Sequence, residues 1–495
     1  MKNKIKSYDV VIITILIISG ILLCNKSIGA DSFYIIKAGE NTLKYGLYTN
    51  DLLLMHKGLN YINQHWLTSI IYYGLSKLFG LKLGMMVNTI IVSSIYLVVM
   101  YILNRKLCKD NYKMAIAISF IEIFPLMYFN CLYNRPQVFS VVLLILFIIN
   151  LENYKETDNK KYLIYNITLS IIEINLHMSI WWILIIALLP YIFNFKLKAN
   201  KIEISIKENI KYLIFSIIIL ITGLLNPYGF KGMTYIFRCG IDKWTKEYCE
   251  EYWSIFKQTS SEQYLYIIVL TAVLVGIIYY IYKNKELEMK YIYFGIGGLL
   301  MSIIAIRNMC FTLVFSCICL CYLLRNIKIE VNQKKFVNIA SIVLLIVIGF
   351  EYNNDMNTCK FNSTNQHIFD NTINMLDNYC QENNIDKENL RLYTHKALGS
   401  YIEYNGYHPF DDCRNEALRK EMNGVQDYFI DSIEFSYGLK DCSYLLETYN
   451  IQAIYLTEEA IERVKSTNEE YFNNNWKLYD TQGNTSVQIV LYVRK

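Results

Sequence analysis

Residues 31–67 read DSFYIIKAGENTLKYGLYTNDLLLMHKGLNYINQHWL and directly follow the first long apolar run of the chain. The stretch is too polar for the core of a bilayer, yet it carries aromatic and aliphatic side chains throughout. Asp31 opens it, Asp51 lies near its middle, and His65 comes just before its end. We interpret residues 30–67 as the first outer loop of a polytopic membrane protein, and as a candidate catalytic loop.

The composition supports a membrane protein. Hydrophobic residues make up 54% of the 495 residues and charged residues only 18%, which is less charge than soluble domains carry. The apolar residues are clustered into runs of nearly membrane-spanning length. The formal net charge of +5 is small and scattered along the chain, so we expect no nucleic-acid partner.

The apolar runs predict about eleven transmembrane helices within residues 1–352. Lysine and arginine gather in every second connection between the runs, and the positive-inside rule assigns such connections to the cytoplasm. The N-terminus is therefore predicted to be cytoplasmic and everything after about residue 353 extracytoplasmic. The runs are 10–28, 81–103, 114–130, 136–151, 162–176, 179–195, 211–225, 264–282, 291–306, 308–324 and 336–352.

Residues 353–495 form a polar region of ordinary domain size. Short apolar segments alternate there with helical patterns, which predicts a small extracytoplasmic α/β domain. Its four cysteines lack CxxC spacing, so zinc is not indicated; free thiols and a disulfide both stay open. The predicted fold class is mostly α, a polytopic transmembrane helical bundle followed by this small soluble domain.

A second group of polar residues falls in the connections predicted to be extracytoplasmic. It comprises Arg135, His177, Asn226 and Arg307. Ionisable groups at membrane depth are costly and usually face a cavity inside the protein. A guanidinium recognises phosphate in a bidentate way. We therefore interpret Arg135 and Arg307 as candidate phosphate ligands, together with His177.

Several of the candidate residues also have a structural interpretation. Asp31 can cap the helix that follows it. Asp51 directly follows Asn50 and is favoured as a turn residue. His177 lies in a very short connection, where a buried histidine usually has a structural role, and Asn226 opens an Asn-Pro-Tyr-Gly turn signal. Asp51, His65 and Asn226 are accordingly predicted to support the site rather than to react.

The order of these motifs resembles bacterial polytopic proteins of the GT-C glycosyltransferase superfamily that carry a C-terminal extracytoplasmic α/β domain. That group has an acid and aromatic residues at the start of the first outer loop, a second acid further on, and a closing Trp-Leu. Its Arg-Pro-Gln, Asn-x-His, Asn-Pro-Tyr-Gly, Arg-Asn, Gly-x-Tyr and Asp-x-Arg elements match residues 135–137, 175–177, 226–229, 307–308, 399–401 and 412–414.

The resemblance implies an inverting glycosyltransferase that moves a sugar from a polyprenyl-phosphate-linked donor to an extracytoplasmic glycan, lipid or protein acceptor. The role of the acid in the first outer loop is carried over onto Asp31 alone, as general base or as ligand of a divalent ion such as Mg or Mn. Arg135, His177 and Arg307 would bind the donor phosphate. His65 stands where the family commonly has an acid or a polar residue.

Two other functions fit parts of the sequence. A transporter or flippase of a lipid-linked glycan also needs internal cations, but such proteins commonly contain internal repeats, and we find none in this sequence. A non-catalytic membrane protein that displays a binding domain accounts for residues 353–495. It does not account for the polar residues between the apolar runs.

Overall fold

The computed structural model describes residues 7–109, 111–198, 201–239, 243–283, 286–354, 364–484 and 487–495. The chain folds into two compact units, neither of which is continuous in sequence. Unit 1 comprises Met1–Ser27, Met85–Thr234 and Cys249–Phe361, and unit 2 comprises Ile28–Gly84, Tyr235–Tyr248 and Asn362–Lys495. The first outer loop and the C-terminal region therefore belong to the same unit. The domain boundary expected near residue 353 stays a prediction.

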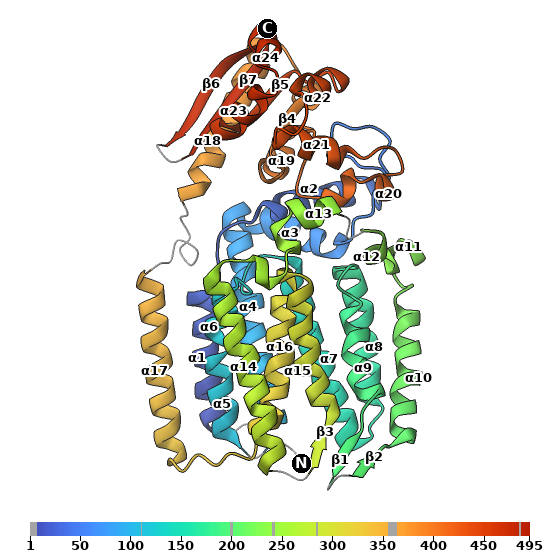
Figure 1. Cartoon of the computed structure of the whole chain (residues 1–495), viewed down its shortest axis with the longest axis vertical. Coiled ribbons are helices and arrows are strands. Elements are labelled where there is room, and N and C mark those ends of the chain that lie inside the picture. The colour runs from blue at the N-terminus through green and yellow to red at the C-terminus, as the bar shows by residue number, and fades with distance from the viewer. Residues whose placement is uncertain are drawn as a thin grey trace. The chain divides into compact units, whose positions relative to one another are not determined.

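Unit 1 is a bundle of helices that run alongside one another (Figure 1). Each of the eleven predicted apolar runs contains a helix, because a backbone within a bilayer must satisfy its hydrogen bonds internally. The helices are α1 (Ser7–Leu23), α4 (Leu81–Leu107), α5 (Tyr112–Ile121), α6 (Ile123–Tyr128), α7 (Pro136–Thr157), α8 (Lys161–Leu176), α9 (Ile183–Ile192), α10 (Ile206–Thr222), α11 (Phe230–Met233), α14 (Ser260–Lys283), α15 (Met289–Ile304), α16 (Met309–Leu324) and α17 (Gln333–Asn354), with 3-10 turns η1 (Glu250–Tyr252), η2 (Ile255–Lys257) and η3 (Ile306–Asn308).

Four helices of the described chain are long and apolar enough to cross a membrane, namely Leu81–Leu107, Pro136–Thr157, Ser260–Tyr282 and Ile306–Leu324. Shorter apolar helices span Tyr8–Leu23, Ile183–Ile192 and Met289–Ile304. On α14 the side chains of Ile268 and Ile278 are 63% and 68% exposed. Such outward apolar surface suits contact with lipid and indicates a membrane protein. The count of eleven spans stays a prediction.

The two ends of unit 1 differ in character. A small sheet in the order β2-β1-β3 lies at the end where α9 and α14 stop (Figure 1). Its antiparallel strands are β1 (Lys196–Lys198), β2 (Lys201–Glu203) and β3 (Glu286–Glu288). The start of α7, the end of α8 and η3 lie at the opposite end of the bundle. The connections that contain Arg135, His177 and Arg307 therefore share one end of unit 1.

Unit 2 contains a four-stranded sheet in the order β4-β5-β7-β6, which confirms the predicted mixture of strands and helices. The pair β4–β5 is parallel, whereas β5–β7 and β7–β6 are antiparallel. The strands are β4 (Leu392–Thr394), β5 (Ala453–Thr457), β6 (Trp476–Asn484) and β7 (Val487–Arg494). The helices are α2 (Ala30–Tyr45), α3 (Trp66–Phe79), α12 (Tyr235–Arg238), α13 (Lys243–Tyr248), α18 (Thr364–Glu382), α19 (Lys396–Tyr404), α20 (Lys420–Asn423), α21 (Tyr428–Ser436), α22 (Cys442–Thr448), α23 (Glu458–Ser466) and α24 (Glu469–Asn475), with 3-10 turns η4 (Lys387–Asn389) and η5 (Asn415–Leu418).

Helix α2 of the first outer loop is part of the hydrophobic core of the C-terminal region. Phe33 is buried, and its ring lies edge-on to Tyr401 of α19 with 4.9 Å between the ring centroids. The same core includes Leu392 of β4 and Tyr455 of β5. Burying a phenylalanine side chain is worth roughly 1.5–3 kcal/mol, so this contact ties the loop to the C-terminal region.

Cysteines of the C-terminal region occur as thiols. Cys380, Cys413 and Cys442 are free, whereas Cys359 lies outside the described residues.

The close approach of α2 to α3 generates a stability prediction. A Cβ atom on Gly39 would lie 2.0 Å from the carbonyl oxygen of Ser69, whereas one on Gly74 of α3 would have no neighbour within 4 Å. We expect Gly39→Ala to lower the melting temperature of the detergent-solubilised protein, since overpacking costs about 1–3 kcal/mol. Gly74→Ala, the matched control, should leave it unchanged or raise it. Equal effects of the two substitutions would contradict this packing.

Candidate functional site

A small cavity of about 20 Å³ lies within unit 2, beside the first outer loop. This volume is enough for one water molecule or a group of similar size. Three kinds of side chain line the cavity: tyrosines, a histidine and a pair of opposite charges. They are Tyr34, Tyr61, Tyr235, His65, Arg414 and Glu416. The first outer loop and the C-terminal region thus contribute to one polar pocket.

Glu416 is the acid in the wall of this cavity. The Tyr235 hydroxyl and the Gln64 side-chain amide both donate to its Oε1, each at 3.0 Å. Burial raises the pKa of Glu416. A backbone hydrogen bond and the hydrogen bond from Tyr235 partly oppose this rise. A carboxyl group with a raised pKa in a polar pocket is a candidate for holding or transferring a proton.

Asp31 lies in the first turn of α2, whose N-cap is Gly29. The interpretation of Asp31 as the N-cap is therefore wrong, although its charge still faces a favourable helix dipole. Burial and then the negative charge of Asp31 raise the pKa of Tyr34, one turn further along α2. Asp31 also raises the pKa of Cys413 through its charge and a hydrogen bond, after the larger effect of burial. Asp31 therefore lies close to the wall of the cavity.

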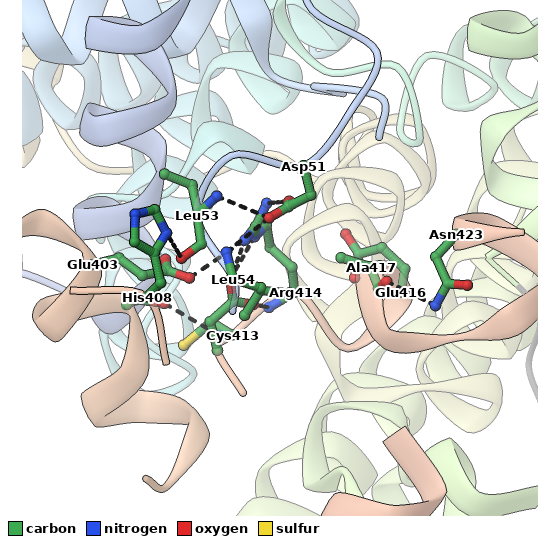
Figure 2. A network of polar contacts seen from close by, with 12 residues as sticks. Asp51, Leu53, Leu54, Glu403, His408, Cys413, Arg414, Glu416, Ala417 and Asn423 are labelled. Atoms are coloured by element: carbon green, nitrogen blue, oxygen red, sulfur yellow. Dashed lines mark hydrogen bonds and ion pairs between the residues drawn. The ribbon is translucent and has the colours of Figure 1, made fainter. Parts of the chain in front are cut away.

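Arg414 connects the cavity to a buried cluster of three carboxylates, shown in part in Figure 2. Its Nε donates to Asp412 at 2.7 Å, and its Nη atoms contact Asp51 and Glu403. The rings of Tyr34 and Tyr61 lie 5.6 Å and 5.1 Å from its Cζ. The Arg414 side chain is only 2% exposed, and a buried guanidinium is tolerated only when such partners compensate its charge.

The carboxylates of this cluster differ in proton affinity. Although burial opposes it, the Arg414 charge and the amides of Leu54 and Leu53 hold the pKa of Asp51 below its usual range. Burial, followed by the charge of Asp412, raises the pKa of Glu403 well above its usual value. Glu403 therefore binds a proton more readily than Asp51, which is paired with Arg414.

Asp51 and His65 occupy structural positions around the cavity. The Asp51 carboxylate accepts from the amides of Leu53 and Leu54 at 2.9 Å and 2.8 Å, which confirms the turn interpretation. His65 is buried at the N-cap position of α3 and lines the cavity. Of the three predicted loop residues, His65 lines the cavity, Asp51 contacts Arg414 in its wall, and the charge of Asp31 acts on Tyr34.

His56 also fixes the first outer loop to the C-terminal region. Its Nε2 donates to the carbonyl oxygen of Phe410 at 2.9 Å, and its ring stacks on Tyr428 with 3.9 Å between centroids. Burial lowers the pKa of His56 to about 4, so the ring is neutral at physiological pH.

In unit 1, the two candidate phosphate ligands meet at the short turn η1. Arg135 Nη2 lies 2.8 Å from Glu251 Oε1. The Arg307 guanidinium lies 4.8 Å from the ring centre of the next residue, Tyr252. Gln137 Nε2 also donates to the backbone carbonyl of Arg307 at 2.8 Å. Both guanidinium groups are thus positioned at the same end of the bundle, each against a side chain of η1.

His177 and Asn226 have mainly structural contacts. His177 is buried, and its Nδ1 lies 3.2 Å from the hydroxyl of Ser140, one helical turn beyond Pro136 on α7. The Asn226 amide donates to the carbonyls of Gly223 and Gly229 at 2.8 Å and 2.9 Å. These bonds confirm the turn predicted at Asn226, where its side chain closes the chain reversal.

A divalent metal at Asp31 is not supported by the surrounding ligands. Within the described ranges, no three or more His, Cys, Asp or Glu residues form a group able to hold a metal ion. Asp31 stays an expected metal ligand from the resemblance only, and we derive no metal-dependent step.

Several residues of the site were not predicted from the sequence. Tyr34 could have been found, because it follows Asp31 at helical spacing and shares its face. Glu416 and Tyr235 carry no local signal and meet only through the fold of unit 2. Glu251 and Tyr252 likewise lie in an irregular connection far in sequence from the arginines they contact.

The fold is similar to that of archaeal oligosaccharyltransferases. Two structures from Archaeoglobus fulgidus match, the enzyme AglB in complex with an inhibitory peptide and a dolichol-phosphate, and an oligosaccharyltransferase in the apo form. AglB gives a TM-score of 0.60 at 10% identity over 98% of this chain and 74% of its own. The apo enzyme gives 0.51 at 11% identity over 92% and 70%. No family model and no curated protein sequence matches this chain.

This similarity extends over nearly the whole chain, and at such low identity it concerns the fold alone. The chain therefore has a fold similar to that of these oligosaccharyltransferases.

Glu403 generates a prediction about pH. A carboxyl group that stays protonated in the fold but ionises in the unfolded chain lowers stability as pH rises above its usual pKa, by about 1.4 kcal/mol per pH unit until its folded pKa is reached. Glutamine resembles the protonated acid, so Glu403→Gln should raise the apparent melting temperature more at pH 8 than at pH 5.

Glu434, which is half-buried and pairs with Lys440 at 3.3 Å, provides a matched control. Glu434→Gln should show little dependence on pH. A melting-temperature shift for Glu403→Gln that is the same at both pH values would contradict the raised pKa of Glu403.

Proposed function

We propose that this chain is a membrane glycosyltransferase of the GT-C type that transfers a sugar from a polyprenyl-phosphate-linked donor to an acceptor outside the cell. The observation that carries the proposal is the position of Asp31. This acid of the first outer loop lies beside a polar cavity of unit 2, in a chain whose fold is similar to that of oligosaccharyltransferases.

Asp31 is the proposed general base. It lies half-buried in the first turn of α2, where the helix dipole favours negative charge. It removes the proton from the acceptor hydroxyl or amine as that atom bonds to the anomeric carbon of the sugar. The bond from the anomeric carbon to the donor phosphate breaks, and the phosphate leaves with the electron pair. Attack on the opposite face inverts the configuration at that carbon.

The proposed ligands of the donor phosphate belong to unit 1. Arg135 and Arg307 lie at the end of the bundle opposite the small sheet, and their planar guanidinium groups suit phosphate. Glu251 holds Arg135 at 2.8 Å, so the donor phosphate takes the place of this partly exposed carboxylate. His177, the third proposed ligand of the phosphate, lies 3.2 Å from the Ser140 hydroxyl of α7.

Two observations support the proposed class of donor: the arginines of unit 1 and the similarity of the fold to AglB. The AglB structure contains a dolichol-phosphate, which is a polyprenyl-type lipid phosphate. Such a lipid keeps its chain in the bilayer while its headgroup reaches the ends of membrane-spanning helices. We extend this donor class to the present chain, with an extracytoplasmic glycan, lipid or protein as the acceptor.

Asp31→Asn tests the proposed base. Asparagine keeps the size of the side chain but removes the charge and the basic oxygen, and general-base assistance contributes on the order of 10²–10⁴ in rate. We expect normal abundance in the membrane and nearly complete loss of the glycan product, measured by mass spectrometry of lipid-linked and cell-envelope glycans.

Glu40→Gln is the matched control, since Glu40 lies on the same helix and makes only a surface pair with Lys37 at 2.8 Å. This variant should retain the product. A fully active Asp31→Asn protein of normal abundance would exclude Asp31 as the base. A glycan profile unchanged by deletion of the whole protein would instead favour a function other than glycosyl transfer.

Arg135→Lys and Arg307→Lys test the proposed phosphate ligands. Lysine keeps the charge but loses the planar fork, so we expect binding of undecaprenyl phosphate to weaken by about 10- to 100-fold, the value of one or two charged hydrogen bonds. Binding is measured as thermal stabilisation of the detergent-solubilised protein at increasing concentrations of the lipid phosphate.

Arg105 supplies the control, because it belongs to the other end of the bundle. Its Nε lies 3.4 Å from Asp9 Oδ1 and its Cζ 4.5 Å from the ring centre of Tyr112, so it too lies against a carboxylate and a ring. Arg105→Lys should bind the lipid phosphate like the parent protein. Unchanged binding in both site variants would show that these arginines do not hold the phosphate.

A further inference from the structure

A second and much larger cavity, of about 570 Å³, lies within unit 1 at the end that carries the small sheet. Residues from the last turns of α7, from β1 and β3, and from the end of α16 line it. Its volume is in the range of small-molecule binding sites. None of the residues assigned to sugar transfer lines it, since these lie at the opposite end of the bundle or in unit 2.

The acids of this cavity are neutralised by the protein itself. Four glutamates line the cavity, and each forms an ion pair with one lysine. Ion pairs of this kind leave little charge for a cationic ligand, which argues against a metal or an amine as the occupant. The pairs are Glu152–Lys290, Glu156–Lys106, Glu286–Lys196 and Glu288–Lys155.

Three further cations line the cavity, Lys109, Lys198 and Arg325. In the part of the chain that the structure describes, no ion pair joins any of the three to a carboxylate. Lys109 and Lys198 are exposed and within reach of a ligand. The cavity therefore has a surplus of three positive charges.

Aromatic side chains hold Arg325 at the wall of the cavity. Its Cζ lies 4.3 Å from the ring centre of Tyr322, and its Nη2 donates to the Tyr280 hydroxyl at 3.3 Å. Tyr322 in turn stacks on Tyr291 with 4.3 Å between centroids. A guanidinium placed in this way still has donors available for an anion.

We propose that this cavity binds a phosphate group, presented by the headgroup of an anionic lipid or by a soluble phosphate compound. Lys109, Lys198 and Arg325 contact the phosphate, and the tyrosines face the carbon skeleton that bears it. The basic connections predict that this end of the bundle faces the cytoplasm, where anionic headgroups attract such cations. The site is independent of the proposed sugar transfer.

The test compares three probes on the parent protein in detergent: dioctanoyl phosphatidylglycerol, dioctanoyl phosphatidylcholine and inorganic phosphate. A bound ligand raises the melting temperature in a concentration-dependent way. We expect stabilisation by phosphatidylglycerol and not by the zwitterionic phosphatidylcholine. Stabilisation by inorganic phosphate at least equal to that by phosphatidylglycerol would identify the soluble source, and a much smaller effect of inorganic phosphate would identify the lipid.

The triple variant Lys109→Gln, Lys198→Gln and Arg325→Gln removes the surplus charge. We expect its apparent affinity for the effective probe to be at least about tenfold weaker. The matched control, Lys160→Gln, Lys161→Gln and Lys207→Gln, removes three exposed lysines from the same end of the bundle that do not line the cavity, and it should bind like the parent.

Three results would overturn the proposal. They are no stabilisation of the parent by either anionic probe, equal stabilisation by phosphatidylcholine and phosphatidylglycerol, and equal loss of binding in the two triple variants. If the cavity variant does not fold, the comparison of probes on the parent still decides the matter. In that case the single variant Arg325→Lys, which keeps the charge, replaces the triple variant. It should bind the effective probe more weakly than the parent.

Discussion

The buried guanidinium of Arg414 is the constraint on which unit 2 depends. A single cation contacts Asp51 from the first outer loop and both Glu403 and Asp412 from the C-terminal region. None of these charges is accessible to water, so each is tolerated only while the others are in place. Because Arg414 also lines the small cavity, the geometry of the pocket beside Asp31 depends on the same contacts that join the loop to the C-terminal region.

In unit 1, the charged side chains discussed above lie at the two ends of the helical bundle. At one end, Arg135 lies against the Glu251 carboxylate and Arg307 against the Tyr252 ring. At the other end, every glutamate in the large cavity is paired, and three cations exceed the acids. Cationic side chains lie at both ends, and the first end also contains His177 and the turn at Asn226. The bundle therefore presents cations at both ends, with different supporting residues.

The sequence predicts features whose signals are local. The apolar helices of unit 1 are evident as continuous apolar runs, and β4, β5 and β7 are short apolar segments of the expected length. The edge strand β6, with Lys477 and Asp480 among its residues, lacks that pattern and is visible only in the structure. The place of Asp31 after the first apolar run indicated this residue as a candidate. The residues around it could not be predicted, since Glu416 and Tyr235 reach the cavity through contacts between segments far apart in the sequence.

The discontinuity of unit 2 has a consequence for synthesis of the protein. Asp51 and Arg414 are 363 residues apart in the chain, and ribosomes add about 5–20 residues per second. Roughly 20–70 s therefore separate the appearance of the carboxylate from that of its guanidinium. During that interval Phe33 and the apolar face of α2 have no C-terminal core to enter. A nascent chain in this state exposes hydrophobic surface, which makes it a substrate for chaperones and proteases.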